Sequence, residues 1–395
     1  MSRLSFDGGA IVRNAISDKK HVTALTVRSF GNQNYHSEFT MTLIASFMWR
    51  GFYFAFGDTL ITTPTRIHED TPIPTQNLPN ETEQIEASGI RVAGLTRKIF
   101  TIGPHLVFGW SGPMANFENG LRYLYAAPLD EPLSLQVLQA IVNDSGLPKD
   151  RASAWFVYAF TCDGAIVGFS HNMRRIAQEK DGIISVAGSG AESFRERLEI
   201  GSAANIDGLS FFNHTLVAQA RYLAEQHRQG RHLDQGFGGA FEFILSENGS
   251  FVSFDRVMIV YRDYWDVEEQ NDVRKDVQNV SRVGNTFSKI DAVYYATHVD
   301  DALIVGRWFT GSHKMFYAAP PFSKGKAWAV APRFGVDYVF EVMAHHSGKQ
   351  AAVFNRVPDE YDFEVIGEDT RLTLPMTLPV DLEIALREHI GAKTG

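Results

Sequence analysis

The stretch Thr42–Thr59, TLIASFMWRGFYFAFGDT, is the strongest indication of the fold in the first half of the chain, because it consists of two apolar runs around a short turn. The runs are Met41–Met48 and Phe52–Leu60, and Trp49-Arg50-Gly51 separates them. Aromatic residues favour strands, and a short break that contains glycine favours a hairpin turn. The sequence therefore predicts a β-hairpin formed by these two runs.

A second pair of strands is expected in Leu95–Gly112, LTRKIFTIGPHLVFGWSG. The strands are about Lys98–Ile102 and His105–Trp110, and Gly103-Pro104 is the turn between them. Lys98 stands at the start of this apolar region. It is either a charge at a strand edge, with its stem along the surface, or a buried cation that needs a partner.

Helical periodicity and further strand pairs follow along the chain. The expected helices are Met114–Tyr125, Leu133–Asn143, Ala191–Ile200 and His214–Gln229. The expected strands are Ala154–Phe160 and Ala165–Phe169 around Asp163-Gly164, Ile183–Val186 before Gly188-Ser189-Gly190, and Ala240–Leu245 with Phe251–Phe254 around Glu247-Asn248-Gly249. Pairs of strands thus alternate with pairs of helices, which predicts an α+β domain of stacked antiparallel sheets covered by helices on both faces.

A chain of 395 residues favours two domains. We expect an N-terminal extension or propeptide at 1–41, with a candidate strand at His21–Phe30, and a main domain at 42–261. Within the main domain, residues 62–95 form an inserted, proline-containing arm. Residues 262–282 are strongly charged and are interpreted as a linker or helix, and residues 283–395 are interpreted as a second, mostly β domain.

Composition excludes several classes of function. A net charge of −9 and a pI near 5.8 argue against a nucleic-acid partner. No apolar run has membrane-spanning length, and the N-terminus lacks the apolar core of a signal peptide, so a cytoplasmic location is expected. The single cysteine, Cys162, excludes an intramolecular disulfide and a cysteine-based metal cluster, and His345-His346 lacks a third ligand, so no metal site is expected.

Five local matches in the right order make residues 42–254 resemble a β-type proteasome subunit, which is an N-terminal-nucleophile hydrolase. The matches are Thr42 opening the first strand with Asp58 ending the second, Lys98 in TRKIF, Gly112 after the next strand pair, Ser189 within GSG, and Asp234 before Gly238-Gly239 in DQGFGG. The resemblance implies a four-layer αββα sandwich of two antiparallel sheets, with an additional C-terminal β-rich domain.

The resemblance also implies a role for each matched residue. Thr42 would be the nucleophile, and its freed α-amine would be the base. Lys98 and Asp58 would form the activating pair, and the Gly112 amide would bind the oxyanion. Ser189 and Asp234 would orient the amine.

These roles agree with general chemistry. A threonine hydroxyl is a weak nucleophile, and an α-amine with a pKa near 8 is a better base than a lysine. A buried lysine needs a partner such as Asp58. An oxyanion donor of this kind contributes roughly 3 kcal/mol.

By the same resemblance, the side chain before the scissile bond would bind in a pocket lined by Ile61, Thr62, Thr96, Trp110 and Met114. Trp110 is bulky, which favours small apolar side chains. The substrate would be a peptide or another amide, no cofactor would be needed, and the chain would assemble with copies of itself, as the ring-forming members do.

Two alternatives remain open from the sequence. The first is a catalytically silent subunit that is never processed, because Met41 stands where the family commonly has glycine and Leu60 where active members usually have arginine. The second is an amidase of the same mechanism that acts on a small molecule. Taken singly, Thr42 also fits an ordinary strand residue and Ser189 a helix N-cap. A classical triad built on Ser111 is disfavoured, since WSGP lacks the glycines of a nucleophile elbow.

Overall fold

The computed structural model describes residues 27–30, 42–63, 73–74, 91–127, 131–179, 182–197, 235–266, 281–283, 286–299, 301–309, 312–321, 338–345 and 351–356, and single positions between 208 and 226. These residues fall into two compact units. The first holds the described residues of 1–218, 226–254 and 318–325, and the second holds those of 219–225, 255–317 and 326–395. The twenty described strands form four sheets.

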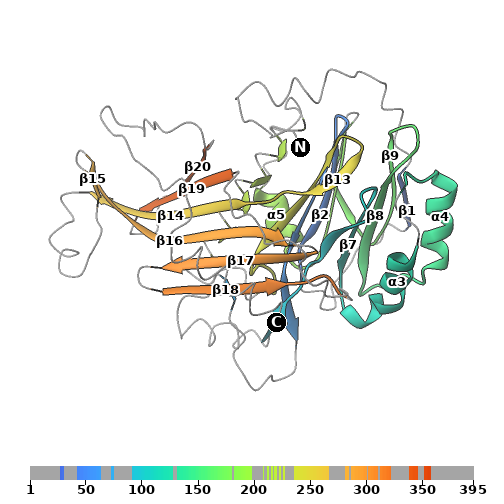
Figure 1. Ribbon diagram of the computed structural model, residues 1–395, viewed down its shortest axis with the longest axis horizontal. Helices are drawn as coiled ribbons and strands as arrows, with labels where there is room; N and C mark the ends of the chain where they lie inside the picture. Colours follow the sequence, from blue (N-terminus) through green and yellow to red (C-terminus); the bar gives the residue numbers. More distant parts are fainter. Residues whose placement is uncertain are drawn as a thin grey trace. The chain divides into compact units, whose positions relative to one another are not determined.

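The first unit contains two larger sheets, drawn with their helices in Figure 1. The five-stranded sheet has the order β1 (Val27–Phe30), β9 (Ile166–His171), β8 (Ala154–Phe160), β7 (Leu106–Ser111) and β6 (Ile99–Ile102). The six-stranded sheet has the order β10 (Arg174–Glu179), β11 (Gly182–Ala187), β2 (Ile44–Trp49), β3 (Phe52–Asp58), β12 (Phe241–Glu247) and β13 (Ser250–Ser253). A small third sheet pairs β4 (Leu60–Thr63) with β5 (Arg91–Leu95).

The hairpin predicted from Thr42–Thr59 is confirmed as β2 and β3. The strands pair antiparallel, with Ile44 opposite Gly57 and Trp49 opposite Phe52. The turn at Arg50 and Gly51 has positive φ angles of 49° and 80°, which the glycine accepts without strain. All six residues of β2 are buried, so both faces of this strand are covered.

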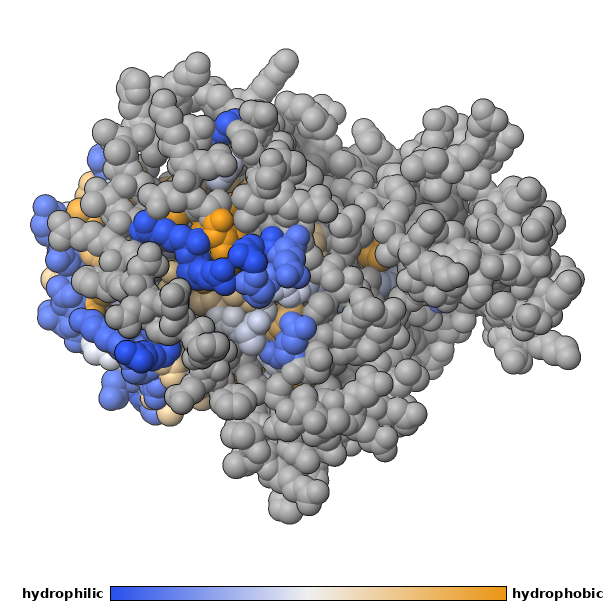
Figure 2. Space-filling model, turned by 180° about the vertical axis from the view of Figure 1, so that it is seen from behind, coloured by the Kyte–Doolittle hydropathy of each residue, from blue (hydrophilic) through white to orange (hydrophobic). Residues whose placement is uncertain are grey.

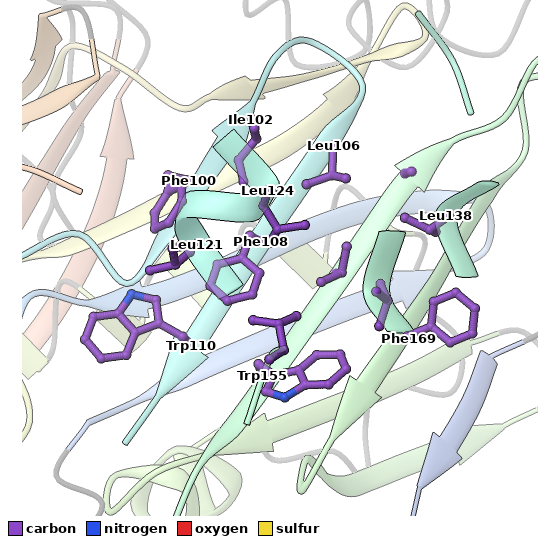
Figure 3. Packing of buried hydrophobic residues seen from close by; sticks show 14 of the residues in the cluster. Phe100, Ile102, Leu106, Phe108, Trp110, Leu121, Leu124, Leu138, Trp155 and Phe169 are labelled. Atoms are coloured by element: carbon purple, nitrogen blue, oxygen red, sulfur yellow. The ribbon is translucent and has the colours of Figure 1, made fainter. Parts of the chain in front are cut away.

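Two helices cover one face of the five-stranded sheet (Figure 1). They are α3 (Met114–Ala126) and α4 (Leu135–Asp144), close to the predicted ranges. The Ser134 hydroxyl accepts a hydrogen bond from the Val137 amide and so caps α4. Figure 3 shows the apolar cluster beneath these helices, which includes Phe108, Trp110, Leu121, Leu138 and Trp155.

Different residues of β2 and β3 belong to two separate apolar layers. Ile44, Met48 and Ala55 join residues of the five-stranded sheet in a second core cluster. Phe47 and Phe54 stack at 4.1 Å, and Phe47 also contacts the ring of Phe194 in α5 (Ala191–Arg197). The hairpin that carries the candidate site is therefore held on both sides by packed rings, which limits its motion.

The second unit is built on a seven-stranded sheet. Its order is β18 (Ser312–Ala318), β17 (Ala302–Phe309), β16 (Thr286–Val299), β14 (Val257–Asp266), β19 (Tyr338–His345) and β20 (Ala351–Arg356), and β15 (Ser281–Val283) pairs with β16. The strand β16 alone has 14 residues.

The predicted four-layer αββα sandwich of two antiparallel sheets is wrong. The described residues form twenty strands in four sheets against three helices, so this described part of the chain is mainly β-sheet. The edge strand β1 also pairs with β9 in parallel. Local periodicity cannot reveal such a pairing, because it depends on contacts between distant parts of the chain.

The charged segment 262–282 is also corrected in part. Residues Arg262–Asp266 continue β14, and they pair with β16 on one side, while Arg262–Tyr264 also pair with β19 on the other. Neighbouring strands thus impose an extended conformation on a charge-rich sequence that was interpreted as linker or helix. Residues 267–280 of this segment lie outside the described residues, as does most of the predicted helix His214–Gln229.

The surface of the described residues is largely hydrophilic in the view of Figure 2, where apolar patches are small. Among these residues, the large apolar side chains that are exposed are Met114, Tyr123 and Val137. No helix within the described ranges is long and apolar enough to cross a membrane.

Candidate active site

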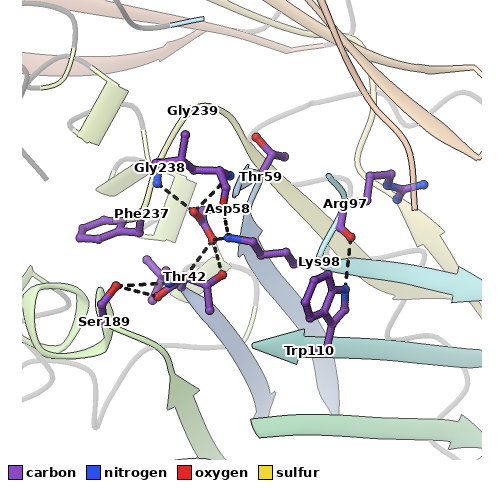
Figure 4. A network of polar contacts seen from close by, with 12 residues as sticks. Thr42, Asp58, Thr59, Arg97, Lys98, Trp110, Ser189, Phe237, Gly238 and Gly239 are labelled. Carbon is purple, nitrogen blue, oxygen red and sulfur yellow. Dashed lines mark hydrogen bonds and ion pairs between the residues drawn. The ribbon is translucent and has the colours of Figure 1, made fainter. Parts of the chain in front are cut away.

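The carboxylate of Asp58 is the centre of the candidate site (Figure 4). Asp58 is the last residue of β3 and is fully buried. Its Oδ1 accepts hydrogen bonds from Thr42 Oγ1 at 2.7 Å, from the Leu43 amide at 2.8 Å and from Lys98 Nζ at 2.7 Å. Its Oδ2 accepts from the amides of Gly238 at 2.8 Å and Leu60 at 3.3 Å. Three donors therefore converge on Oδ1 and two on Oδ2 of this one carboxylate.

The second charged group is Lys98, which is 3% exposed and lies just before β6. Its ammonium donates to Asp58 Oδ1 and to the backbone oxygen of Leu60 at 2.5 Å. Burial lowers the pKa of Lys98 below its usual value, although the charge of Asp58 acts in the opposite direction. The sequence left two interpretations of Lys98, a charge at a strand edge or a buried cation with a partner. The burial of Lys98 and its contact with Asp58 support the second.

An ammonium has three N–H donors, and two of those of Lys98 have partners within the described part of the chain. The third is available to a neighbouring oxygen that gains negative charge. Because the pair is shielded from water, such an interaction would be stronger than at the surface.

Thr42 connects this charged pair to the glycine-rich turn after β11. It is 1% exposed. Its backbone nitrogen donates to Ser189 Oγ at 3.2 Å, and its carbonyl oxygen accepts from the Gly190 amide at 3.1 Å. The Ser189 hydroxyl also lies 3.4 Å from this carbonyl. The side chain, amide and carbonyl of Thr42 are therefore all held in place.

The close approach to Thr42 explains why glycine stands at position 188. A Cβ atom on Gly188 would lie 2.0 Å from the Thr42 carbonyl oxygen, and the residue has a φ of 97°. A side chain there would have to push Thr42 away from Asp58. The run Gly188-Ser189-Gly190 therefore forms a support for the backbone of Thr42.

The structure brings four of the six predicted catalytic residues into one network, namely Thr42, Asp58, Lys98 and Ser189. Gly112 follows β7 with a φ of 128°, and a Cβ there would lie 2.6 Å from the Ala152 oxygen. Gly112 lies outside this hydrogen-bonded network of the described residues, so its oxyanion role stays a prediction. Asp234 lies outside the described residues.

The predicted pocket residues lie on several elements. Ile61 and Thr62 are in β4, and Met114 is exposed at the start of α3. The Thr96 hydroxyl donates to the Ala319 oxygen at 2.8 Å. Trp110 belongs to the core beneath α3, and its indole nitrogen donates to the Arg97 oxygen at 3.3 Å. The tryptophan is thus held in the core, and the pocket itself stays a prediction.

Sequence reasoning missed several residues next to the site. Arg97 and Glu242 form a buried ion pair at 2.7 Å, and the carboxylate of Glu242 also acts to raise the pKa of Lys98. The amide of Gly238 was missed as a donor to Asp58, although the Gly-Gly pair in DQGFGG marks a tight turn. Gln226, which contacts this turn, carries no signal in the sequence.

Other kinds of site have less support. Within the described ranges, no three histidine, cysteine, aspartate or glutamate residues lie close enough together to hold a metal ion. The hydroxyl of Ser111 is buried and has no hydrogen-bond partner among the described residues, so no triad is formed around it there. Neither protein-family models nor curated proteins gave any match to this chain.

Proposed function

We propose that the chain is a self-processing threonine hydrolase, resembling a proteasome β subunit in its chemistry, which cleaves peptide or other amide bonds. The observation that carries the proposal is the buried network in which Asp58 joins the Thr42 hydroxyl to the Lys98 ammonium. A hydroxyl, an acceptor for its proton and a cation for developing negative charge are the three groups that nucleophilic attack on an amide requires.

Self-processing begins at the bond between Met41 and Thr42. Thr42 Oγ1 attacks the carbonyl carbon of Met41, and Asp58 Oδ1, at 2.7 Å, is within reach of the proton that the hydroxyl loses. The C–N bond then breaks, the nitrogen of Thr42 takes up a proton, and the acyl group is left as an ester on Oγ1. Water hydrolyses the ester and releases residues 1–41 with a new carboxyl end.

The freed amine then serves as the base toward a substrate. It takes the hydroxyl proton as Oγ1 attacks the substrate carbonyl, and it returns a proton to the leaving amine of the product. Lys98 stabilises negative charge on the reacting oxygens, and Ser189 orients the amine from its position beside the Thr42 nitrogen. The acyl group of the substrate is left as an ester on Oγ1. Water hydrolyses this ester, which releases the acid product and restores the Thr42 hydroxyl. Assembly with further copies of the chain and a cytoplasmic location are parts of the same proposal.

A second candidate function is a subunit that is never processed, and one observation favours it. The strand Val27–Phe30 pairs with β9 over four residues, so part of the N-terminal segment belongs to the five-stranded sheet. Cleavage after Met41 would leave this strand attached only through non-covalent contacts, which include its pairing with β9. Detection of cleavage therefore requires denaturing conditions, in which a bound segment separates.

Hydrolysis of a mixed peptide library tests the proposed activity. We expect wild type to cleave peptides, Thr42→Ser to retain part of the activity, and Thr42→Ala to fall to background, because only the first two have a hydroxyl at this position. The products are identified by mass spectrometry. Equal cleavage by wild type and Thr42→Ala would show that another residue or a contaminant is responsible.

A further inference from the structure

We propose that Gln226 is a positioning residue, which holds the Phe237–Gly239 turn so that the Gly238 amide stays directed at Asp58. The catalytic part of this inference rests on the proposed function. Because Gln226 bonds to this turn, it would act on Thr42 and Lys98 through the turn and the Asp58 carboxylate.

The first step is the contact between Gln226 and the turn. Gln226 is fully buried. Its Oε1 accepts from the Gly239 amide at 3.3 Å, and its Nε2 donates to the Phe237 oxygen at 3.3 Å. One side chain therefore bonds to the backbone on both sides of Gly238.

The close fit of Gly238 to Gln226 supports the same conclusion. Gly238 has a φ of 126°, and a Cβ atom there would lie 2.0 Å from Gln226 Nε2. The turn thus has a conformation that glycine accepts, with no room for a side chain between it and the amide group. A shift of the Gln226 side chain would leave the buried Gly239 amide and Phe237 oxygen without this hydrogen-bond partner.

The second step is the contact between the turn and Asp58. The Gly238 amide donates to Asp58 Oδ2 at 2.8 Å, and the Gly238 oxygen accepts from the amides of Thr59 at 3.3 Å and Leu60 at 3.1 Å. A single residue of the turn therefore binds the carboxylate and the two residues that follow it. Figure 4 shows this turn beside Asp58, on the side away from Thr42.

The third step is the effect on Lys98. The Lys98 ammonium donates to Asp58 Oδ1 and to the Leu60 oxygen, and both acceptors belong to the segment that Gly238 holds. If the turn moves, the two acceptors move with it. Gln226 would thus influence the position of the Lys98 ammonium relative to the Thr42 hydroxyl indirectly, through the turn and then through Asp58 and Leu60.

The test uses Gln226→Met in the full chain, since methionine has a similar length and shape but cannot form the two hydrogen bonds. Gln219→Met, at another buried glutamine, is the matched control. We expect release of residues 1–41 to slow by about 10- to 100-fold in Gln226→Met, the range typical of outer residues that orient metal ligands. Gln219→Met should release the segment at nearly the wild-type rate.

Two further readouts separate positioning from a general loss of stability. The alkaline limb of the pH profile of release should move to lower pH in Gln226→Met, because a displaced Asp58 carboxylate raises the pKa of Lys98 less. Amide hydrogen exchange at Gly238 and Leu60 should also become faster than in Gln219→Met. An unchanged rate and pH profile in Gln226→Met, with wild type releasing normally, would overturn the proposal.

The positioning role of Gln226 can also be tested if the proposed function fails. If wild type never releases residues 1–41, the hydrolase proposal is wrong, and hydrogen exchange alone decides the role of Gln226. Faster exchange at Gly238 and Leu60 in Gln226→Met, and not in Gln219→Met, would support its positioning of Asp58. Unchanged exchange would overturn it.

Discussion

Replacing Asp58 with alanine is expected to lower the free energy of unfolding by about 3–5 kcal/mol, because it leaves the buried ammonium of Lys98 without its charged partner. Four other donors, from Thr42, Leu43, Leu60 and Gly238, also lose their acceptor. Denaturation in urea, followed by circular dichroism, measures the change. The loss is among the largest expected for any single substitution in this chain.

The loss of unfolding free energy in Asp58→Ala is expected to depend on pH. Without Asp58, the pKa of Lys98 falls further below its usual value, because the attraction between the ammonium and the carboxylate is removed. Between the lower pKa of the variant and that of wild type, the folded variant binds fewer protons than folded wild type. Its deficit in stability should therefore shrink as the pH rises through this window.

Glu118→Gln is the control for the stability measurement. Glu118 forms an exposed ion pair with Arg122 in α3, at 3.0 Å, and such pairs contribute only about 0.3–0.5 kcal/mol. Asp58→Asn is a second variant for the case in which Asp58→Ala does not fold. A loss below about 1 kcal/mol in both Asp58 variants would contradict a buried, paired carboxylate.

Replacing Lys98 with methionine is expected to slow the release of residues 1–41 by at least about 100-fold, since it removes the charge that stabilises the reacting oxygens. Methionine fills the space of the lysine stem, and Asp58 keeps its four other donors. Intact mass during incubation gives the release rate. Arg122→Met, at an exposed position in α3, should release the segment as wild type does. Normal release by Lys98→Met, with a folded structure, would exclude Lys98 from the reaction.

Part of this arrangement could be predicted from the sequence. The apolar runs around Arg50-Gly51 predict the hairpin correctly, because alternation and turn composition are local properties. The helical spacing of Met114–Tyr125 and Leu133–Asn143 likewise predicts α3 and α4. The proximity of Thr42, Asp58 and Lys98 followed only from the resemblance, since the two charged residues are 40 positions apart.

Other features depend on long-range contacts that no local pattern reports. The parallel pairing of β1 with β9 and the extension of β14 into a charged segment are decided by neighbouring strands. The role of Gln226 depends on a turn 11 residues away in the sequence. The fold class was wrong for the same reason, because the extent of the strands is set by tertiary pairing.

The intact mass of wild type under denaturing conditions, measured beside Thr42→Ala, shows whether Thr42 gains a free amine. We predict that wild type has lost residues 1–41, so that its chain begins at Thr42 with a free amine, and that Thr42→Ala keeps them. The denaturing step separates any segment that remains bound through β1. If both proteins keep their full length after prolonged incubation, Thr42 has no free amine, and the threonine hydrolase account is contradicted.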